Sequence, residues 1–401
     1  MLKKFINQSI PYGRQKIDNQ DLNLVKSSIF GKLITTGPFV LRFENDIKKY
    51  LKSKYAFTCS SGTAAIHLAF LSIGLKKGDN IIMPAINFIA AYNLAKIMGA
   101  NIFLADVDSM TGQMSPQNLL NCIKNNKIKK IKAFLTMYLG GHPENIKEFY
   151  FLKKKFKCFY IEDACHALGA EYKVKEKMYK VGSCKHSDIS TFSLHPLKTI
   201  TTGEGGIITT TNKKISQKIS LFKSHGLIKD KKFYWKYESN FPGLNYRLSD
   251  INSALGCSQL KKIKLFLKKR LLIAKRYSLG LEKHKNIISL PTYNLTNIPS
   301  WHLFLISINF KKISKNKDFF IKYLNKFKIY PQVHYTPIYN FKMVKNFSKK
   351  NFPHSELYSK SVVSLPIFVD LSIKNQNHII TKIENFIKLY KKKLKTLKCI
   401  I

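Results

Sequence analysis

Arginine and acidic residues are scarce in this chain of 401 residues. Five of its 69 basic residues are arginine, 23 residues are acidic, and the formal net charge at pH 7 is +46. The lysines spread along the whole chain, whereas nucleic-acid surfaces cluster arginines with aromatic residues. The composition therefore favours a solvated lysine-rich surface and no nucleic-acid partner, although such a positive field attracts nucleotide diphosphates.

Long apolar runs are also missing. No stretch of about 18 apolar residues is present, so we expect no transmembrane helix and no membrane partner. The segment Met1–Gln8 is basic and lacks the apolar core of a signal peptide. On these grounds we expect a cytoplasmic protein.

The seven cysteines are scattered and include no Cys-x-x-Cys pair. This pattern argues against a disulfide framework and against a zinc site. We therefore expect no metal, and we interpret most of these cysteines as small buried hydrophobic residues.

Between about residues 55 and 210, short apolar runs alternate with segments of helical periodicity. This alternation is typical of an α/β fold with a mostly parallel sheet. The helices are expected at Ala64–Ile73, Asn87–Met98 and Asn145–Lys155. The strands are expected at Ala56–Cys59, Asn80–Met83, Asn101–Ala105, Ala133–Met137, Cys158–Glu162, Ile189–Ser193 and Gly206–Thr210.

The remainder of the chain predicts a smaller α+β domain over residues 265–401, after a large domain with an N-terminal arm over residues 1–264. A long helix is expected at Leu248–Leu281 and leads into the smaller domain. This helix spans the predicted domain boundary, so it can belong to both domains. Strands at Phe304–Ile308 and Gln332–Tyr335 follow, and a helix at Gln376–Lys393 ends the pattern.

Three predicted strands end in polar motifs, and ligands of open α/β sheets bind at those ends. The first motif, Cys59–Ala65, runs into a helix whose free N–H groups and positive dipole end suit a phosphate. Gly62 permits close approach of the backbone, and Thr63 adds a hydroxyl. The alternative is that these residues only cap the helix.

The second motif, Glu162-Asp163-x-x-His166, lies at the end of the predicted strand Cys158–Glu162. Asp163 is a buried acid that requires a cationic partner, for example a protonated pyridine nitrogen. His166 can stack on such a ring or bond its phenolic oxygen. The alternative is that Asp163 caps a helix and His166 is a core histidine with satisfied hydrogen bonds.

The third motif is the most informative. Ser193 ends a strand, a turn with proline then presents Lys198, and the Gly-rich segment Gly203–Gly206 leads back into a strand. Desolvation lowers the pKa of such a lysine, which can then form a Schiff base. The alternative is that Lys198 is an ordinary solvated surface lysine, as most lysines of such a lysine-rich chain are.

The fourth motif, Gly243–Asp250, precedes a helix that Ser249 or Asp250 caps. Asn245 and Arg247 are polar groups with no local partner. The alternative is an ordinary loop.

The order of these motifs resembles the DegT/DnrJ/EryC1/StrS family of sugar aminotransferases over nearly the whole chain. The resemblance rests on Gly62-Thr63, Phe88, Glu162-Asp163-x-x-His166, Ser193-x-His195-x-x-Lys198, Gly203–Gly206 and Asn245-Tyr246-Arg247. It implies a fold type I architecture dependent on pyridoxal 5'-phosphate (PLP), and a homodimer with a shared active site. Further stretches resemble members of the pseudaminic acid (nonulosonate) pathway: Ile10–Gln15, His195–Thr202, Phe222–Gly226 and Gln332–Tyr339.

The resemblance also implies site residues. The catalytic residues would be Lys198, as the Schiff-base lysine and proton shuttle, together with Asp163 and His166. The cofactor-binding residues would be these three and Gly62, Thr63, Ala64, Phe88, Ser193 and Asn245, the last from the other subunit. The substrate-binding residues would be Tyr12, Lys32, Thr35, Gly62, Ser193, Asn245, Arg247, His334 and Tyr335.

The implied reaction is amination of a UDP-linked 4-keto-6-deoxy-N-acetylhexosamine, with L-glutamate as amino donor. Family members that act as dehydratases carry histidine in place of the Schiff-base lysine, so Lys198 favours an aminotransferase. Two alternatives stay open: an aminotransferase for another UDP-, dTDP- or GDP-linked keto-sugar, and a lysine-rich nucleic-acid-binding or regulatory protein on an inactive aminotransferase scaffold.

Overall fold

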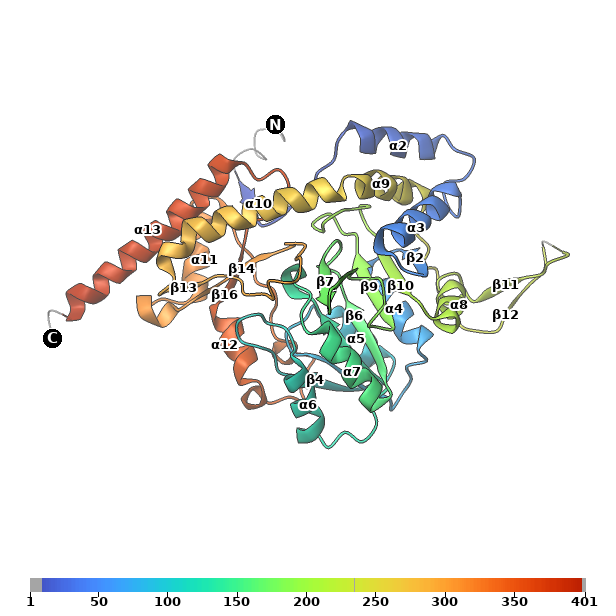
Figure 1. Cartoon of the computed structure of the whole chain (residues 1–401), viewed down its shortest axis with the longest axis horizontal. Helices are drawn as coiled ribbons and strands as arrows, with labels where there is room; N and C mark the ends of the chain where they lie inside the picture. Colours follow the sequence, from blue (N-terminus) through green and yellow to red (C-terminus); the bar gives the residue numbers. More distant parts are fainter. Residues whose placement is uncertain (1–8, 234, 399–401) are drawn as a thin grey trace.

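A seven-stranded sheet forms the centre of the larger part of the molecule (Figure 1). The computed structural model describes residues 9–233 and 235–398. The strand order is β2-β10-β9-β6-β5-β3-β4; β10 runs antiparallel to both neighbours, and the other pairs are parallel. All seven predicted strands are confirmed to within one residue at each end: β2 (Tyr55–Cys59), β3 (Asn80–Pro84), β4 (Asn101–Ala105), β5 (Ala133–Met137), β6 (Phe159–Asp163), β9 (Ile189–Ser193) and β10 (Gly206–Thr210).

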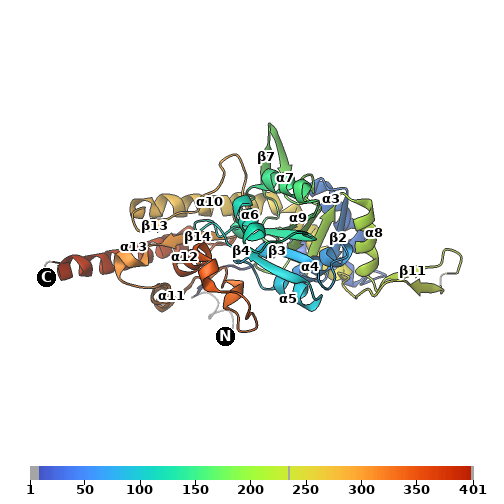
Figure 2. The ribbon, with the colours of Figure 1, turned by 90° about the horizontal axis from the view of Figure 1, so that it is seen from below.

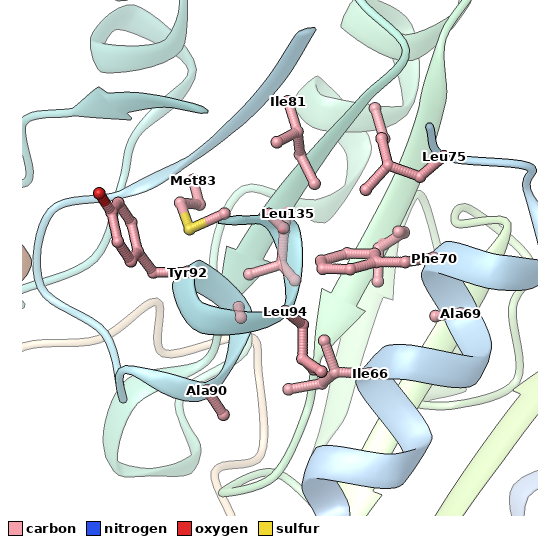
Figure 3. Close-up of a cluster of buried hydrophobic side chains, with 14 of the residues drawn as sticks. Ile66, Ala69, Phe70, Leu75, Ile81, Met83, Ala90, Tyr92, Leu94 and Leu135 are labelled. Atoms are coloured by element: carbon pink, nitrogen blue, oxygen red, sulfur yellow. The ribbon is translucent and has the colours of Figure 1, made fainter. Parts of the chain in front are cut away.

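Helices cover both faces of this sheet because successive strand residues point to opposite sides. In β5, Leu135 packs into one cluster with the helices α4 (Gly62–Ser72), α5 (Ala90–Ile97) and α8 (Lys213–Phe222), part of which Figure 3 shows. Its neighbour Phe134 faces the other side, where α6 (Pro116–Asn125) and α7 (Ile146–Phe156) pack. On that side α3 (Pro38–Leu51) and α9 (Asp250–Lys261) complete the layer.

The predicted helices of this region are confirmed with small shifts at their starts. α4 begins at Gly62, two residues earlier than predicted, because the side chain of Ser61 caps it by accepting from the N–H of Ala64. α5 begins at Ala90 instead of Asn87. Asn87 and Phe88 instead lie in the turn after β3, which brings Phe88 to the end of the sheet.

A smaller sheet forms the centre of the second part. Its strands are β13 (Ile288–Ser289), β14 (Phe304–Ile308) and β16 (Val362–Leu365). α10 (Ile263–Leu281), α11 (Lys317–Lys326) and α13 (Ile373–Lys398) pack around one apolar core with it, and α12 (Pro353–Ser361) contacts β14. The chain start joins this part, since β1 (Ile10–Pro11) pairs with β15 (Ile329–Tyr330).

The predicted domain boundary between residues 264 and 265 lies inside α10 and stays a prediction. In Figure 1, α10 runs from the larger part to a position beside α13. Among the helices of residues 9–233 and 235–398, none is long and apolar enough to cross a membrane.

Two sequence predictions for the second half are wrong. The helix expected over Leu248–Leu281 is two helices that meet at Lys262, whose ammonium contacts Asp21 of α2 (Asn19–Ile29) at 2.6 Å. The strand expected at Gln332–Tyr335 is irregular, with one isolated bridge from Gln332 to Ser364. Both departures follow from tertiary contacts that a local pattern does not contain.

Several elements lie outside the segments predicted from the sequence. α2 and α3 precede the first predicted strand, and two hairpins leave the body of the molecule (Figure 2). These hairpins are β7 (Glu171–Val174) with β8 (Lys177–Lys180), and β11 (Leu227–Lys229) with β12 (Tyr237–Ser239).

A buried carboxylate of α9 holds the start of α3. The N-cap of α3 is Gly37, which has no capping side chain. Asp250 replaces it from 213 positions away, since its oxygens accept from the N–H groups of Gly37 at 2.5 Å, Phe39 at 2.7 Å and Val40 at 3.3 Å. Asp250 is fully buried, so these donors have no water to bond instead.

We predict that Asp250→Ala lowers the free energy of unfolding by about 3 kcal/mol, because it leaves buried N–H donors of α3 unpaired. Urea denaturation followed by circular dichroism measures the change. Asp46→Ala is the matched control, because Asp46 pairs with Arg42 of its own helix, at 3.9 Å, and caps no other element in the described part of the chain. Equal stability of the two variants would contradict the capping role of Asp250.

Candidate active site

A cavity of about 370 Å³ lies where the carboxyl ends of β2, β6 and β9 meet. These strands are parallel to one another, so the residues that follow them share one edge of the sheet. The predicted site residues that line the cavity are Tyr12, Gly62, Thr63, Phe88, Asp163, His166, Ser193, Lys198, His334 and Tyr335.

The N-terminus of α4 and the end of β9 form one wall of the cavity. Gly62 lies so close to β9 that a Cβ atom on it would meet the Cβ of Ser193 at 2.8 Å. The absence of a side chain therefore allows Ser193 to share a small concave surface with the first N–H groups of the helix, as an anion requires. Ser61 is the helix cap, as the alternative interpretation expected, and it uses the N–H of Ala64; Ala64 is buried and does not line the cavity.

Asp163 and Lys198 line the same cavity. Asp163 is 3% exposed, and one of its oxygens accepts from the N–H of Cys165 at 3.2 Å. Burial raises the pKa of Asp163, and the hydrogen bonds from Cys165 and the nearby charge of Lys198 oppose this only in part. Burial lowers the pKa of Lys198, against the opposing effects of Cys165 and Asp163. Lys198 is half-buried and lines the cavity, so it is not a solvated surface lysine.

His166 is buried beside this pair. Its Nδ1 accepts from the N–H of Gly140 at 3.4 Å, and its Nε2 lies 2.9 Å from the hydroxyl of Tyr335. Burial, followed by the charge of Lys198, holds the pKa of His166 well below its usual range. Both ring nitrogens are thus occupied by protein groups, which leaves the ring face to contact a ligand. The alternative of a histidine with satisfied hydrogen bonds is correct in this respect.

Aromatic side chains surround the mouth of the cavity. Phe88 is 53% exposed, and its ring centroid lies 5.8 Å from that of Tyr335. Tyr12 lies 5.3 Å from His334, whose Nδ1 is 2.8 Å from the hydroxyl of Ser364. The smaller part of the molecule therefore supplies one wall of the site.

Four predicted substrate residues lie elsewhere. Lys32, Thr35, Asn245 and Arg247 do not line the cavity. They gather near the start of α9: Thr35 forms a bridge with Ser249, Asn245 forms one with Ser224, and the guanidinium of Arg247 donates to the hydroxyl of Ser224 at 3.0 Å. The structure of one chain thus divides the predicted residues into two groups.

Other residues that line the cavity were not predicted as site residues, among them His195 and Glu204, which lie within the third motif, and His302, which lies outside all four. His302 is buried, its ring centroid lies 4.2 Å from that of His166, and its Nδ1 has no hydrogen-bond partner within the described part of the chain. The buried Arg270 donates to the carbonyl oxygens of Trp301 and His302 on this segment. The chain has only five arginines, and one of them, Arg270, lies in the predicted long helix. This was the signal in the sequence that could have pointed to the segment of His302.

These residues fit a pyridine cofactor with a phosphate. The buried acid suits a protonated ring nitrogen, the half-buried amine suits an aldehyde, and the surface at Gly62 and Ser193 suits the phosphate. The fold and the site define a fold type I PLP-dependent aminotransferase.

Comparisons with known proteins agree, since the chain matches the DegT/DnrJ/EryC1/StrS aminotransferase family over residues 15–384. It is 33% identical over 374 residues to the UDP-4-amino-4,6-dideoxy-N-acetyl-beta-L-altrosamine transaminase of Campylobacter jejuni, covering 92% of this chain and 95% of that protein. It is 32% identical over 368 residues to an uncharacterized protein of Methanocaldococcus jannaschii, covering 90% and 92%.

Solved structures show the same fold. Helicobacter pylori PseC, an aminotransferase involved in the biosynthesis of pseudoaminic acid, superposes with a TM-score of 0.87 at 28% identity, covering 95% of this chain and all 100% of that one. A putative sugar aminotransferase of Streptococcus pneumoniae in its PLP form gives 0.85 at 24% identity, covering 96% and 99%. The chain belongs to the DegT/DnrJ/EryC1/StrS family and is a PLP-dependent sugar aminotransferase.

The coupling of Asp163 to Lys198 predicts a pH effect in the cofactor-free protein. Only the neutral amine reacts with an acylating reagent, and the charge of Asp163 favours the ammonium form. Asp163→Asn removes that charge, so the pKa of Lys198 falls further and its acylation sets in at lower pH. Brief acetylation over a pH series, with mass spectrometry of the Lys198 peptide, measures the midpoint.

Asp46→Asn is the control for this experiment, because Asp46 does not line the cavity. An unchanged or raised midpoint in Asp163→Asn would contradict the proposed coupling.

Proposed function

We propose that this enzyme aminates a UDP-linked 4-keto-6-deoxy-N-acetylhexosamine to the 4-amino sugar in pseudaminic acid (nonulosonate) biosynthesis, with L-glutamate as amino donor. The single observation that carries the proposal is the meeting of Lys198, Asp163 and the Gly62–Ser193 surface in one cavity. The choice of sugar is supported by the Campylobacter jejuni relative, whose name states a UDP-linked 4-amino product.

Each side chain has a role in this proposal. PLP supplies an aldehyde for the amine and a ring that accepts electron density from the reacting carbon. Asp163 would keep the ring nitrogen protonated, and its burial would strengthen that ion pair. Lys198 holds the cofactor and then moves a proton as a neutral amine, which its lowered pKa favours.

The surroundings of these groups position the ligands. Phe88 lines the cavity where it would stack on the ring, and the hydroxyl and N–H groups of Ser193, Gly62 and Thr63 would hold the phosphate. The sugar nucleotide enters beside Tyr12 and His334 at the mouth of the cavity. The net charge of +46 favours the approach of a diphosphate.

We predict that hydride reduction of the cofactor-loaded enzyme fixes the cofactor on Lys198, and that Lys198→Ala abolishes turnover. Peptide mapping locates the adduct, and amine formation is assayed in parallel with UDP-, dTDP- and GDP-linked 4-keto sugars. Lys213→Ala, a change in an exposed lysine at the start of α8, is the control. An adduct on another lysine would overturn the site, whereas a preference for another nucleotide would overturn only the substrate.

The second group of predicted residues supports a site shared between two copies of the chain. Lys32 and Thr35 lie in the connection between α2 and α3, and Asn245 and Arg247 lie before α9. Exposed apolar side chains lie on α2, on α3 and on the connection between them, with Phe30 at 79%; the others are Leu22, Leu33, Ile34 and Leu41. An exposed apolar surface of this kind is typical of a subunit interface. We infer a homodimer in which Asn245 completes the cofactor site of the partner.

A heterodimer tests this arrangement. Subunits carrying Lys198→Ala and Asn245→Ala, each with its own affinity tag, are co-expressed and purified through both tags. Each homodimeric variant should be inactive, but the heterodimer should retain about half of the wild-type activity, because one of its two sites has both native residues.

An inactive heterodimer would show that Asn245 acts within its own subunit. Failure to recover any protein with both tags would show that the chains do not associate.

A further inference from the structure

The tautomer of His166 follows from its two partners. The N–H of Gly140 is a donor only, and it points at Nδ1 of His166 with a separation of 3.4 Å. Nδ1 must therefore carry a lone pair and no hydrogen. In a neutral imidazole the hydrogen then lies on Nε2. The histidine is neutral because burial and the nearby charge of Lys198 disfavour the imidazolium form and lower its pKa.

The same reasoning fixes the hydrogen of Tyr335. The Nε2–H group of His166 lies 2.9 Å from the hydroxyl oxygen of Tyr335, which must accept this hydrogen bond. The hydroxyl hydrogen of Tyr335 is then free of His166. Tyr335 lines the cavity together with Asp163 and Lys198, so its hydroxyl is placed beside the reacting groups.

Tyr335 also keeps this hydrogen. Burial and the neighbouring charge of Asp163 raise the pKa of its hydroxyl well above the ordinary value. Its ring contacts Phe88 on one side and His166 on another, with centroid separations of 5.8 and 5.9 Å, and these contacts limit its orientation. Tyr335 is therefore a neutral hydrogen-bond donor held in place at neutral pH.

We propose that Tyr335 donates its hydroxyl hydrogen to an oxygen atom of the bound reactants, and that His166 is a positioning residue that directs it there. The proposal rests on the proposed function for the identity of those reactants. Two oxygen atoms have the required chemistry: the phenolic oxygen of the cofactor and the carbonyl oxygen of the keto-sugar. Both accept a hydrogen bond, and the experiments below distinguish them.

The tautomer is tested without any cofactor. Protein labelled with ¹⁵N in its 11 histidines shows one-bond and two-bond couplings that identify which ring nitrogen carries hydrogen. The resonance of His166 is assigned as the one missing from His166→Gln. Hydrogen on Nε2 is the expected result, and hydrogen on Nδ1 would overturn the proposal whether or not the protein is an aminotransferase.

Substitutions at His166 separate positioning from mere packing. In His166→Gln the amide oxygen can accept from Gly140 and the amide nitrogen can donate to Tyr335, so kcat should fall less than in His166→Leu. In His166→Leu neither bond forms, and kcat should fall about tenfold. Equal loss of kcat in the two variants, with the fold retained, would show that His166 only fills space.

Substitutions at Tyr335 identify the oxygen that accepts its hydrogen bond. If the cofactor oxygen accepts, Tyr335→Phe shifts the visible absorption of the cofactor-loaded protein before sugar is added. If the sugar carbonyl accepts, that spectrum is unchanged, while the keto-sugar half-reaction slows about tenfold and the donor half-reaction does not. Tyr339→Phe is the matched control, because the Tyr339 hydroxyl bonds to Glu356 outside the cavity.

A Tyr335→Phe enzyme with an unchanged spectrum and unchanged rates in both half-reactions would overturn the proposal. A wild-type protein with the expected tautomer but no amination of any keto-sugar would instead overturn the proposed function.

Discussion

The site depends on the burial of an acid and an amine in one cavity. Asp163 is buried and Lys198 is half-buried, and desolvation raises the pKa of the acid and lowers that of the amine. A ligand that gives the carboxylate of Asp163 a cationic partner, or the amine of Lys198 a covalent one, is therefore stabilised in this cavity. PLP supplies both, a ring nitrogen for the acid and an aldehyde for the amine, and the carboxyl edge of the sheet provides the rigid support.

The smaller part of the molecule supplies the second wall of the cavity. His302 and Tyr335 come from segments far along the chain, yet both contact His166. The buried Arg270 holds the segment of His302 through carbonyl oxygens instead of a carboxylate, and it bonds Ile367 as well. The guanidinium of Arg270 thereby connects two loops of the smaller part, and these bonds hold His302 in its position on the second wall of the cavity.

Local patterns predicted the larger part well and the second wall poorly. β5 is buried on both faces, so it is a short apolar run between turn residues, and its ends were predictable for that reason. The segment Gln332–Tyr335 was also predicted as a strand. It forms an isolated bridge instead, and His334 and Tyr335 line the cavity. The start of α3 carries no capping signal, since its cap is Asp250 of a distant helix.

The sequence by itself determined the chemistry of the site: a lysine after a strand end, an acid at another strand end, and a glycine before a helix, because parallel strands must bring their carboxyl ends to one edge. It also determined the family. Tertiary structure alone decided which predicted residues share a cavity, since the separation of Lys32 and Asn245 from Lys198 depends on the packing of helices. It alone decided the tautomer of His166 too, because hydrogen positions follow from partners in space and not from residue spacing.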